Sequence, residues 1–211
     1  MTSPILYDYV RSSASYRVRI ALNLKGVEHE RVPVNLLEGT QKQEGYRARN
    51  PQGLVPVLEI DGHRIVQSLA IIDYLDATRP VPRLVPHDPA ERARVLAMAL
   101  AIACDIHPLN NLRVLKYLSG PLGQPQEVRD AWYAHWVSEG LTALEAMAQG
   151  GAGRFLHGDA PSLADICLVP QMFNARRFNL PVDAWPTLVR ADAEANALPA
   201  FAAAHPDAIG T

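Results

Sequence analysis

The chain has 211 residues, of which 48% are hydrophobic, a length and composition that suit one large globular domain or two small ones. Its 20 basic and 22 acidic residues leave a formal charge of -2, which gives no electrostatic reason to expect a nucleic-acid or membrane partner. Neither a signal peptide nor a membrane span of roughly 20 apolar residues is recognisable, so we expect a cytoplasmic protein. Cys104 and Cys167 are too few and too far apart for a disulfide framework or a metal site, and we expect both to be small buried side chains.

The first residues of the chain alternate between strand and helix patterns. Residues 4–10 are typical of a strand, and helical spacing follows up to Gly26. A second strand is expected at 29–34. The polar segment 36–49 has only a weak helical pattern.

A hairpin and a helix follow. The apolar runs 55–60 and 63–67 are separated by Asp61-Gly62, which is a strong signal for a two-residue turn. A helix is expected from Ser68, with its apolar face formed by Ile71, Ile72 and Leu75. The order β-α-β and then β-β-α predicts a small mixed sheet covered by helices in residues 1–78.

A proline-rich stretch then changes the character of the chain. Residues 79–88 are expected to form a linker, because repeated prolines can neither continue a helix nor join a central strand. Asp88 as N-cap, Pro89 at the first helical position and Glu91 two positions later predict the start of a long helix. Everything in 89–211 is helical in pattern.

The helices of this second region carry recognisable apolar faces. The first has one stripe, expected to serve the core or a subunit interface, formed by Val95, Met98, Ile102, Ile106 and Leu109. Pro108 is expected to kink that helix. Trp132 and Trp136 are expected to pack rather than to bind a ligand. Ser162 and Asp165 match a capping box, which we interpret as structural.

Hydroxyl residues stand at the first strand-to-helix turn. They are Ser12, Ser13 and Ser15, among Arg11, Arg17 and Arg19. A hydroxyl at a helix N-terminus can cap the helix or help to hold an anion. Capping is the commoner role of an isolated serine, so the rest of the chain must decide.

Two more features of the first domain could bind a peptide-like ligand. Pro56 stands just before a strand, where a cis bond could turn the backbone groups of Val55 toward an extended peptide, or where it could simply begin the strand. Gln67 and Ser68 begin a helix, where hydroxyl and N–H groups can hold a carboxylate, although Ser68 alone is just an N-cap.

Taken in order, these features resemble the glutathione transferase family. The stretch RSSASYRVRIALNLKG is similar to the signature of its zeta class, the maleylacetoacetate and maleylpyruvate isomerases, and further likeness lies in NPQGLVPVL, QSLAIIDYL, ACDIHPLNNLRVLKYL and PSLADICLVPQ. The resemblance implies an α/β plus all-α fold, in which a thioredoxin-like N-terminal domain, 1–78, precedes an all-helical C-terminal domain, 89–211. It also implies glutathione as cofactor and a homodimer.

The resemblance assigns residues to glutathione. Ser12, with Ser13 as the adjacent alternative, would be catalytic and assist the thiol. Val55 would pair with the cysteinyl backbone, Gln67 and Ser68 would bind the γ-glutamyl end, and Gln41 and His107 would lie near the glycine end. The implied cofactor-binding residues are thus Ser12, Gln41, Val55, Gln67, Ser68, His107 and Asn110.

The implied activity is the cis-trans isomerisation of a maleyl diketo acid in aromatic-compound catabolism. The glutathione thiolate would add to the cis double bond, allow rotation and be eliminated again, so cations are needed for the substrate carboxylates and the developing charge. The candidates are Arg11, Arg113, Arg177 and their neighbour Arg176, each of which could instead be a solvated surface charge.

One departure from the zeta signature limits the mechanism. Ala14 stands where that signature commonly has cysteine, so the nucleophile must come with the cofactor. Two alternatives stay open: a transferase that conjugates small electrophiles or dehalogenates α-halo acids, and a non-catalytic module that binds a protein partner. The sequence does not choose between maleylacetoacetate and maleylpyruvate.

Overall fold

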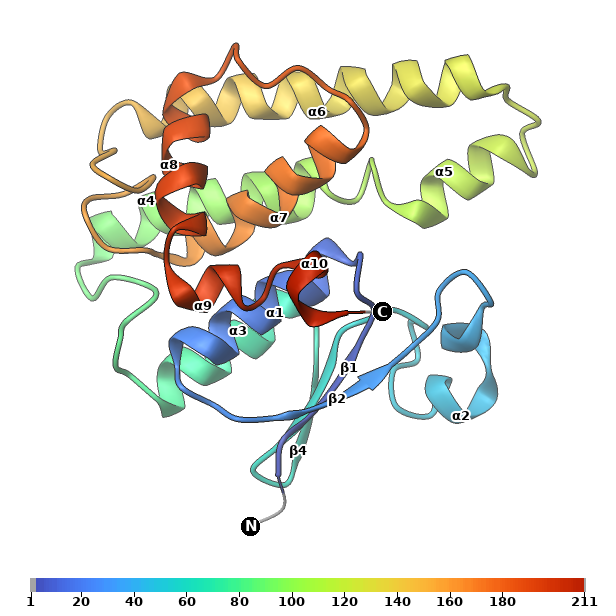
Figure 1. Ribbon diagram of the computed structural model, residues 1–211, viewed down its shortest axis with the longest axis horizontal. Coiled ribbons are helices and arrows are strands. Elements are labelled where there is room, and N and C mark those ends of the chain that lie inside the picture. Colours follow the sequence, from blue (N-terminus) through green and yellow to red (C-terminus); the bar gives the residue numbers. More distant parts are fainter. Residues whose placement is uncertain (1–2, 211) are drawn as a thin grey trace. The chain divides into compact units, whose positions relative to one another are not determined.

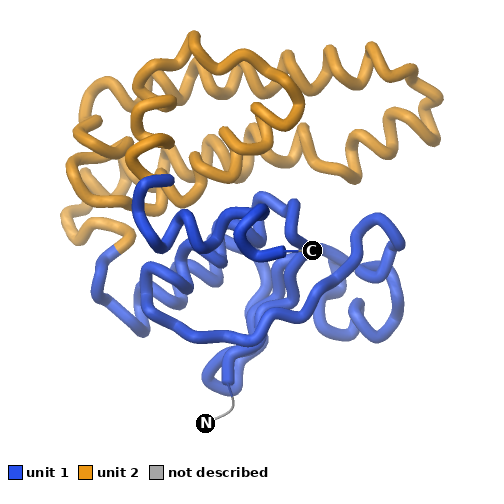
Figure 2. Tube along the Cα trace, viewed as in Figure 1, with its two compact units in different colours: residues 1–83, 196–211 blue, residues 84–195 orange. Residues whose placement is uncertain are grey.

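The computed structural model describes residues 3–210, and the chain divides into two compact units (Figure 2). Unit 1 comprises Met1–Arg83 and Asn196–Thr211, and unit 2 comprises Leu84–Ala195. Among the described residues, no helix has the length and apolarity needed to cross a membrane.

Unit 1 is built on a four-stranded mixed sheet in the order β2-β1-β3-β4. Its strands are β1 (Ile5–Asp8), β2 (Glu30–Pro33), β3 (Val57–Ile60) and β4 (His63–Val66). β1 runs parallel to β2 and antiparallel to β3, and β3 pairs with β4 as a hairpin. The predicted two-residue turn is confirmed, with φ of 52° at Asp61 and 78° at Gly62, the left-handed values that such a turn requires.

Helices cover both faces of this sheet. The longer ones are α1 (Ser13–Leu24) and α3 (Ser68–Thr78), which pack against each other, and Figure 1 shows them across the sheet from the short α2 (Glu44–Arg47). A one-turn 3-10 helix, η1 (Thr40–Lys42), precedes α2. The predicted apolar face of α3 is confirmed, because Ile71, Ile72 and Leu75 are fully buried.

A buried ion-pair network joins the elements of unit 1. Arg19 on α1 donates Nη1 to both carboxylate oxygens of Asp8, at 2.8 and 2.9 Å, and Arg31 on β2 donates Nε to Asp8 at 3.0 Å. Asp8 and Arg19 are buried. Burial lowers the pKa of the Arg19 guanidinium, and the charge of Asp8 opposes that shift.

The last residues of the chain belong to unit 1, although their sequence continues the helical pattern of the second region. They form the end of α8 and the short α9 (Pro199–Ala202) and α10 (Pro206–Ile209). Side chains of unit 1 hold them, since Arg19 Nε donates to the carbonyl of Ala204 and Arg31 Nη1 to that of Ile209. These hydrogen bonds span 178 or more residues, which no local pattern encodes.

Unit 2 is helical. Its elements are α4 (Pro89–Leu100), the π-helical η2 (Ala101–Ile106), α5 (Leu112–Ser119), α6 (Gln126–Ala148), α7 (Leu163–Arg177) and α8 (Pro186–Asn196), whose last residue lies in unit 1. The start of α4 is as predicted, since Asp88 accepts hydrogen bonds from the backbone N–H groups of Ala90 and Glu91. Helix α7 packs against α4 and is buried over most of its length.

The first helical run ends before Pro108 instead of kinking there. The backbone changes to π-type hydrogen bonding after Leu100, with His107 N–H donating to the carbonyl of Ile102. A turn then separates this run from α5, which Asn111 caps. Because proline lacks the N–H and clashes with the preceding turn, ending the helix avoids both penalties.

Local features of unit 2 follow the sequence pattern, with one exception. The capping box at Ser162 and Asp165 is confirmed, and the Asp165 carboxylate also accepts from the N–H of Leu156 at 2.8 Å. Burial raises the pKa of that carboxyl, although its hydrogen bonds oppose the shift. Cys167 is buried as expected, but Cys104 is exposed because it lies on the outer side of η2, so that expectation was wrong.

One close contact in unit 2 gives a stability prediction. A Cβ added at Gly140 on α6 would lie 2.2 Å from Cγ1 and 2.6 Å from Cδ1 of Ile106, which is itself buried. We expect Gly140→Ala to lower the free energy of unfolding by about 1–2 kcal/mol, because overpacking outweighs the gain in helix propensity. Urea unfolding measures this. Gly45→Ala is the control, since nothing lies within 4 Å of a Cβ there, and an equal loss in both variants would contradict the steric explanation.

Candidate active site

The sheet register places the predicted ligand-binding residues of unit 1 at one end of the sheet. Val57 pairs with Tyr7 on one side and with Val66 on the other. The residues that follow β1, precede β3 and follow β4 therefore lie at the same end of the sheet. These are the segments that carry Ser12, Val55, Gln67 and Ser68.

Ser12 is the N-cap of α1. Its Oγ accepts a hydrogen bond from the backbone N–H of Ser15 at 3.2 Å, so the expected cap is confirmed. A hydroxyl that accepts in this way still has its proton to donate. Capping and anion binding are thus compatible at Ser12. Ser13, the first residue of α1, is buried, and Arg11 is exposed.

The loop before β3 is held by buried side chains. The Tyr46 hydroxyl and the Asn50 amide donate to the Leu54 carbonyl, at 2.8 and 2.7 Å. Burial raises the pKa of Tyr46, so its phenol remains a donor at neutral pH. The Val55-Pro56 bond that follows is cis. No local pattern in the sequence points to this role of Tyr46 and Asn50, because it depends on a loop that only the fold defines.

Gln67 and Ser68 occupy the start of α3. Gln67 has a φ of 71°, unusual for a residue with a side chain, and its amide donates to Oε1 of Gln52 at 2.6 Å. Ser68 is 5% exposed, and its Oγ accepts from Nη1 of Arg17 at 3.4 Å. Arg17 and Gln52 are further neighbours of the site that the sequence left without a role.

Gln41 lies in η1, beside the loop that precedes β3. A Cβ at Gly53, where φ is +61°, would meet the backbone oxygen of Gln41 at 2.9 Å, so this approach requires glycine. The Oε1 atom of Gln41 is buried, and no group in the described part of the chain forms a hydrogen bond with it. An acceptor left in this state favours binding of a ligand that carries a donor.

The other predicted cofactor residues lie in unit 2. His107 is half-buried, and its Nε2 is 3.3 Å from the amide nitrogen of Asn111. Asn110 is 4% exposed, and its amide donates to Oε1 of Gln171 on α7 at 3.5 Å. His107 is therefore the more accessible of the two for a ligand.

The predicted substrate arginines of unit 2 differ in their partners. Arg176 forms a 2.6 Å ion pair with the buried carboxylate of Asp192. Arg177 lies over the ring of Phe178, 4.7 Å from its centroid, and donates to Oδ1 of Asn174 at 2.7 Å. Arg113 is exposed in the first turn of α5. The ion pair ties Arg176 to α8, whereas the contacts of Arg177 lie near the end of α7.

Aromatic residues of α6 connect these segments within unit 2. Trp132 donates its Nε1 proton to the carbonyl of Leu109 at 2.8 Å, and Tyr133 stacks on Phe178 with ring centroids 4.1 Å apart. Helix α6 thus packs against both the turn that follows His107 and the end of α7. This agrees with the expectation that Trp132 has a packing role.

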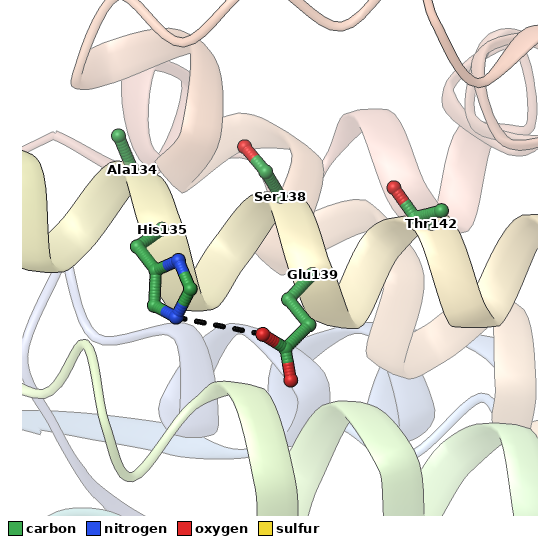
Figure 3. Close-up of a pocket in the computed structure, with 5 residues that line it drawn as sticks. All are labelled: Ala134, His135, Ser138, Glu139 and Thr142. Atoms are coloured by element: carbon green, nitrogen blue, oxygen red, sulfur yellow. Dashed lines mark ion pairs between the residues drawn. The ribbon is translucent and has the colours of Figure 1, made fainter.

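A shallow pocket on α6 is distinct from these residues (Figure 3). Its lining consists of Ala134, His135, Ser138, Glu139 and Thr142, all from one helix. His135 and Glu139 form a 3.4 Å ion pair across one turn, and both side chains are largely exposed. Across the described part of the chain, no three His, Cys, Asp or Glu side chains cluster as metal ligands do.

The fold is that of a thioredoxin-like sheet domain followed by a helical domain. The sheet domain presents the N-termini of α1 and α3, which carry Ser12 and Ser68. Family models described as the N-terminal and C-terminal domains of glutathione S-transferase match residues 6–83 and 130–206. The chain belongs to the glutathione S-transferase family.

Its relatives place it more narrowly within that family. The chain is 50% identical over 204 residues to the maleylacetoacetate isomerase of Rhizobium meliloti strain 1021. This alignment covers 96% of each of the two chains. A solved maleylpyruvate isomerase, described as a bacterial zeta-class glutathione S-transferase, superposes with a TM-score of 0.94 at 42% identity over 97% of both chains. The resemblance to the zeta class is confirmed.

A third relative was solved with a ligand. The maleylacetoacetate isomerase of Anaeromyxobacter dehalogenans 2CP-1, with glutathione bound in its active site, superposes with a TM-score of 0.89 at 46% identity. The match covers 98% of this chain and 96% of the relative. The expected glutathione transferase fold is therefore confirmed as well.

Proposed function

We propose that this protein is a glutathione-dependent cis-trans isomerase that converts maleylacetoacetate or maleylpyruvate to its fumaryl isomer. The observation that carries the proposal is the convergence of Ser12 and Ser68, each at a helix N-terminus, at one edge of the sheet of a zeta-class chain. Helix N-termini and hydroxyl donors favour a bound thiolate and a bound carboxylate. Glutathione, which carries both groups, is the cofactor.

The residues of unit 1 fit the parts of glutathione. Ser12 would donate to the thiolate, with Ser13 as the alternative, and the backbone of Val55 would pair with the cysteinyl unit. Gln67 and Ser68 would bind the γ-glutamyl end. The unpartnered Oε1 of Gln41 would accept a hydrogen bond from a peptide N–H near the glycine end. Of the unit 2 residues, His107 would contact the glycine end. Asn110 is buried and its amide donates to Gln171, so it would support this part of the site without contacting glutathione.

The protein stabilises the charges of the reaction. Glutathione, when bound, would supply the thiolate nucleophile that makes the double bond a rotatable single bond, and it would be regenerated at the end of the reaction. Ser12 and the α1 N-terminus hold the thiol in its ionised form, because both interact more favourably with an anion. Arg11, Arg113 and Arg177 would bind the substrate carboxylates and the charge that develops on the adjacent carbonyl.

The direct test is an absorbance assay with both maleyl substrates, with and without glutathione. We expect turnover of at least one substrate, only in the presence of glutathione and without its consumption. The alternative is a general transferase that conjugates or dehalogenates small electrophiles such as α-halo acids. Loss of free thiol with such an acceptor, together with no isomerisation, would establish that alternative.

The arginines provide a test of substrate class. Arg177→Met and Arg113→Met should each lower activity on the maleyl dicarboxylate about ten- to a hundredfold, because each removes a charged hydrogen bond to substrate. Activity with a neutral aryl halide should hardly change. Steady-state kinetics on both substrates measures the difference, and equal losses on both would favour the general transferase.

Arg176→Met is the matched control for Arg177→Met. Its ion pair with Asp192 predicts a loss of stability rather than of dicarboxylate selectivity. A larger selectivity loss in Arg176→Met than in Arg177→Met would show that the two arginines were assigned in the wrong order.

We also propose a homodimer. The α4 stripe suggested for this role, including Val95 and Met98, is buried within unit 2, so the interface must use other side chains. Leu37 and Leu100, which are 66% and 43% exposed, are large apolar residues suited to it. The mass in solution at micromolar concentration should be twice 23.1 kDa, and a monomeric mass would contradict the proposal.

The cytoplasmic location also stays a prediction, which cell fractionation can test.

A further inference from the structure

A buried arginine lies behind the start of α3. Arg17 is 2% exposed, and its Nη1 donates to Oγ of Ser68. Its Nε and Nη2 atoms are buried and have no hydrogen-bond partner among the described residues. Among residues 3–210, no acidic side chain forms an ion pair with it. Arg19, two residues further along the same helix, is equally buried but is neutralised by Asp8.

A buried charge without a counter-ion is costly, and so is each unsatisfied donor. The two buried arginines of α1 therefore differ in kind. Asp8 compensates Arg19 within the folded chain, whereas Arg17 keeps its net positive charge beside a helix N-terminus that is itself positive. An anion bound at that N-terminus would provide the missing charge.

The hydrogen bond between Arg17 and Ser68 also determines what Ser68 can do. Since the Ser68 oxygen accepts from a guanidinium, its own proton is left to be donated to another group. A hydroxyl polarised by a cation is a stronger donor, because hydrogen bonds in a chain reinforce one another at low dielectric. The best acceptor for such a donor is a carboxylate.

We propose that Arg17 is a positioning residue for the cofactor, which makes the Ser68 hydroxyl a donor and provides the counter-charge for the α-carboxylate of the γ-glutamyl unit. This inference rests on the proposed function for the identity of the anion. It predicts that Arg17 contributes to glutathione binding through the α-carboxylate of the γ-glutamyl unit alone and does not touch the reacting atoms.

The experiment compares two peptides by calorimetric titration. One is glutathione, and the other is the analogue in which a 4-aminobutanoyl group replaces the γ-glutamyl unit and so lacks only that carboxylate. We expect the natural protein to prefer glutathione about ten- to a hundredfold. Arg17→Gln keeps N–H donors but removes the charge, and we expect its preference to fall below about threefold. Arg17→Lys, which retains a positive charge, should recover part of the preference for glutathione.

Two further variants make the comparison specific. Arg19→Met removes the other buried arginine of α1 and should lower stability while leaving the preference unchanged. Ser68→Ala should lose the preference as Arg17→Gln does, and it serves the same purpose if Arg17→Gln does not fold. An undiminished preference in Arg17→Gln or in Ser68→Ala would overturn the inference.

The natural protein separates this inference from the proposed function. If it binds both peptides equally well, glutathione dependence stands and the role of Arg17 is refuted. If it binds neither, the proposed function fails and the inference fails with it.

Discussion

Ser12→Ala should lower turnover of a maleyl diketo acid about a hundred- to a thousandfold while glutathione still binds. This is the scale of losing one donor to a developing or bound anion. The Ser12 hydroxyl accepts from the N–H of Ser15, and in the proposed mechanism it donates its proton to the cofactor thiolate. The ultraviolet absorbance of the bound thiolate, titrated with pH, should give a higher midpoint in the variant than in the natural protein, because the thiolate loses a stabilising partner.

The controls separate catalysis from capping, since removal of the cap alone costs about 1 kcal/mol of stability. Ser12→Thr keeps both the hydroxyl and a cap and should retain most of the activity. Ser13→Ala tests the adjacent alternative. If the thiol midpoint and the turnover of Ser12→Ala are both unchanged, Ser12 is only a helix cap.

Asp8→Ala should lower the free energy of unfolding by about 3–5 kcal/mol, the usual loss when one partner of a buried ion pair is removed. The carboxylate of Asp8 is fully buried and receives hydrogen bonds from both Arg19 and Arg31. Without it, the Arg19 guanidinium stays buried and unneutralised. Unfolding in urea at constant pH measures the loss.

The comparison for Asp8→Ala is an ion pair of similar length at the surface. Arg64 and Glu59 are 2.8 Å apart across the β3-β4 hairpin, but both side chains are partly exposed. Arg64→Ala should cost less than about 1 kcal/mol, because solvent screens the pair. The double variant Asp8→Ala/Arg19→Met should be more stable than Asp8→Ala. Similar losses for the buried and surface pairs would contradict this explanation.

Features that depend on a few neighbouring residues were predictable from the sequence. The Asp61-Gly62 turn needs two residues that tolerate positive φ, and the α4 start needs an acceptor at Asp88 within reach of N–H groups two and three positions on. The capping box at Ser162 and Asp165 is equally local. Such signals specify geometry over at most one turn, so they are complete in the sequence itself.

The candidate site residues were proposed from the sequence for a different reason. The Ser12 turn, Val55-Pro56 and Gln67-Ser68 each have an ordinary structural interpretation, and only their order along the chain pointed to the glutathione transferase family. Strand register then shows why they meet, since Val57 pairs with both β1 and β4.

Only the tertiary structure decided which charges are buried and which partners they have. Arg17 and Arg19 stand two residues apart in one basic stretch, yet one meets Ser68 from 51 residues away and the other meets Asp8 and the carbonyl of Ala204. The exposure of Cys104 and the inclusion of Asn196–Thr211 in unit 1 were also decided at this level. The physical reason is that local preferences are set by near neighbours, whereas burial and charge compensation depend on segments that only folding brings into contact.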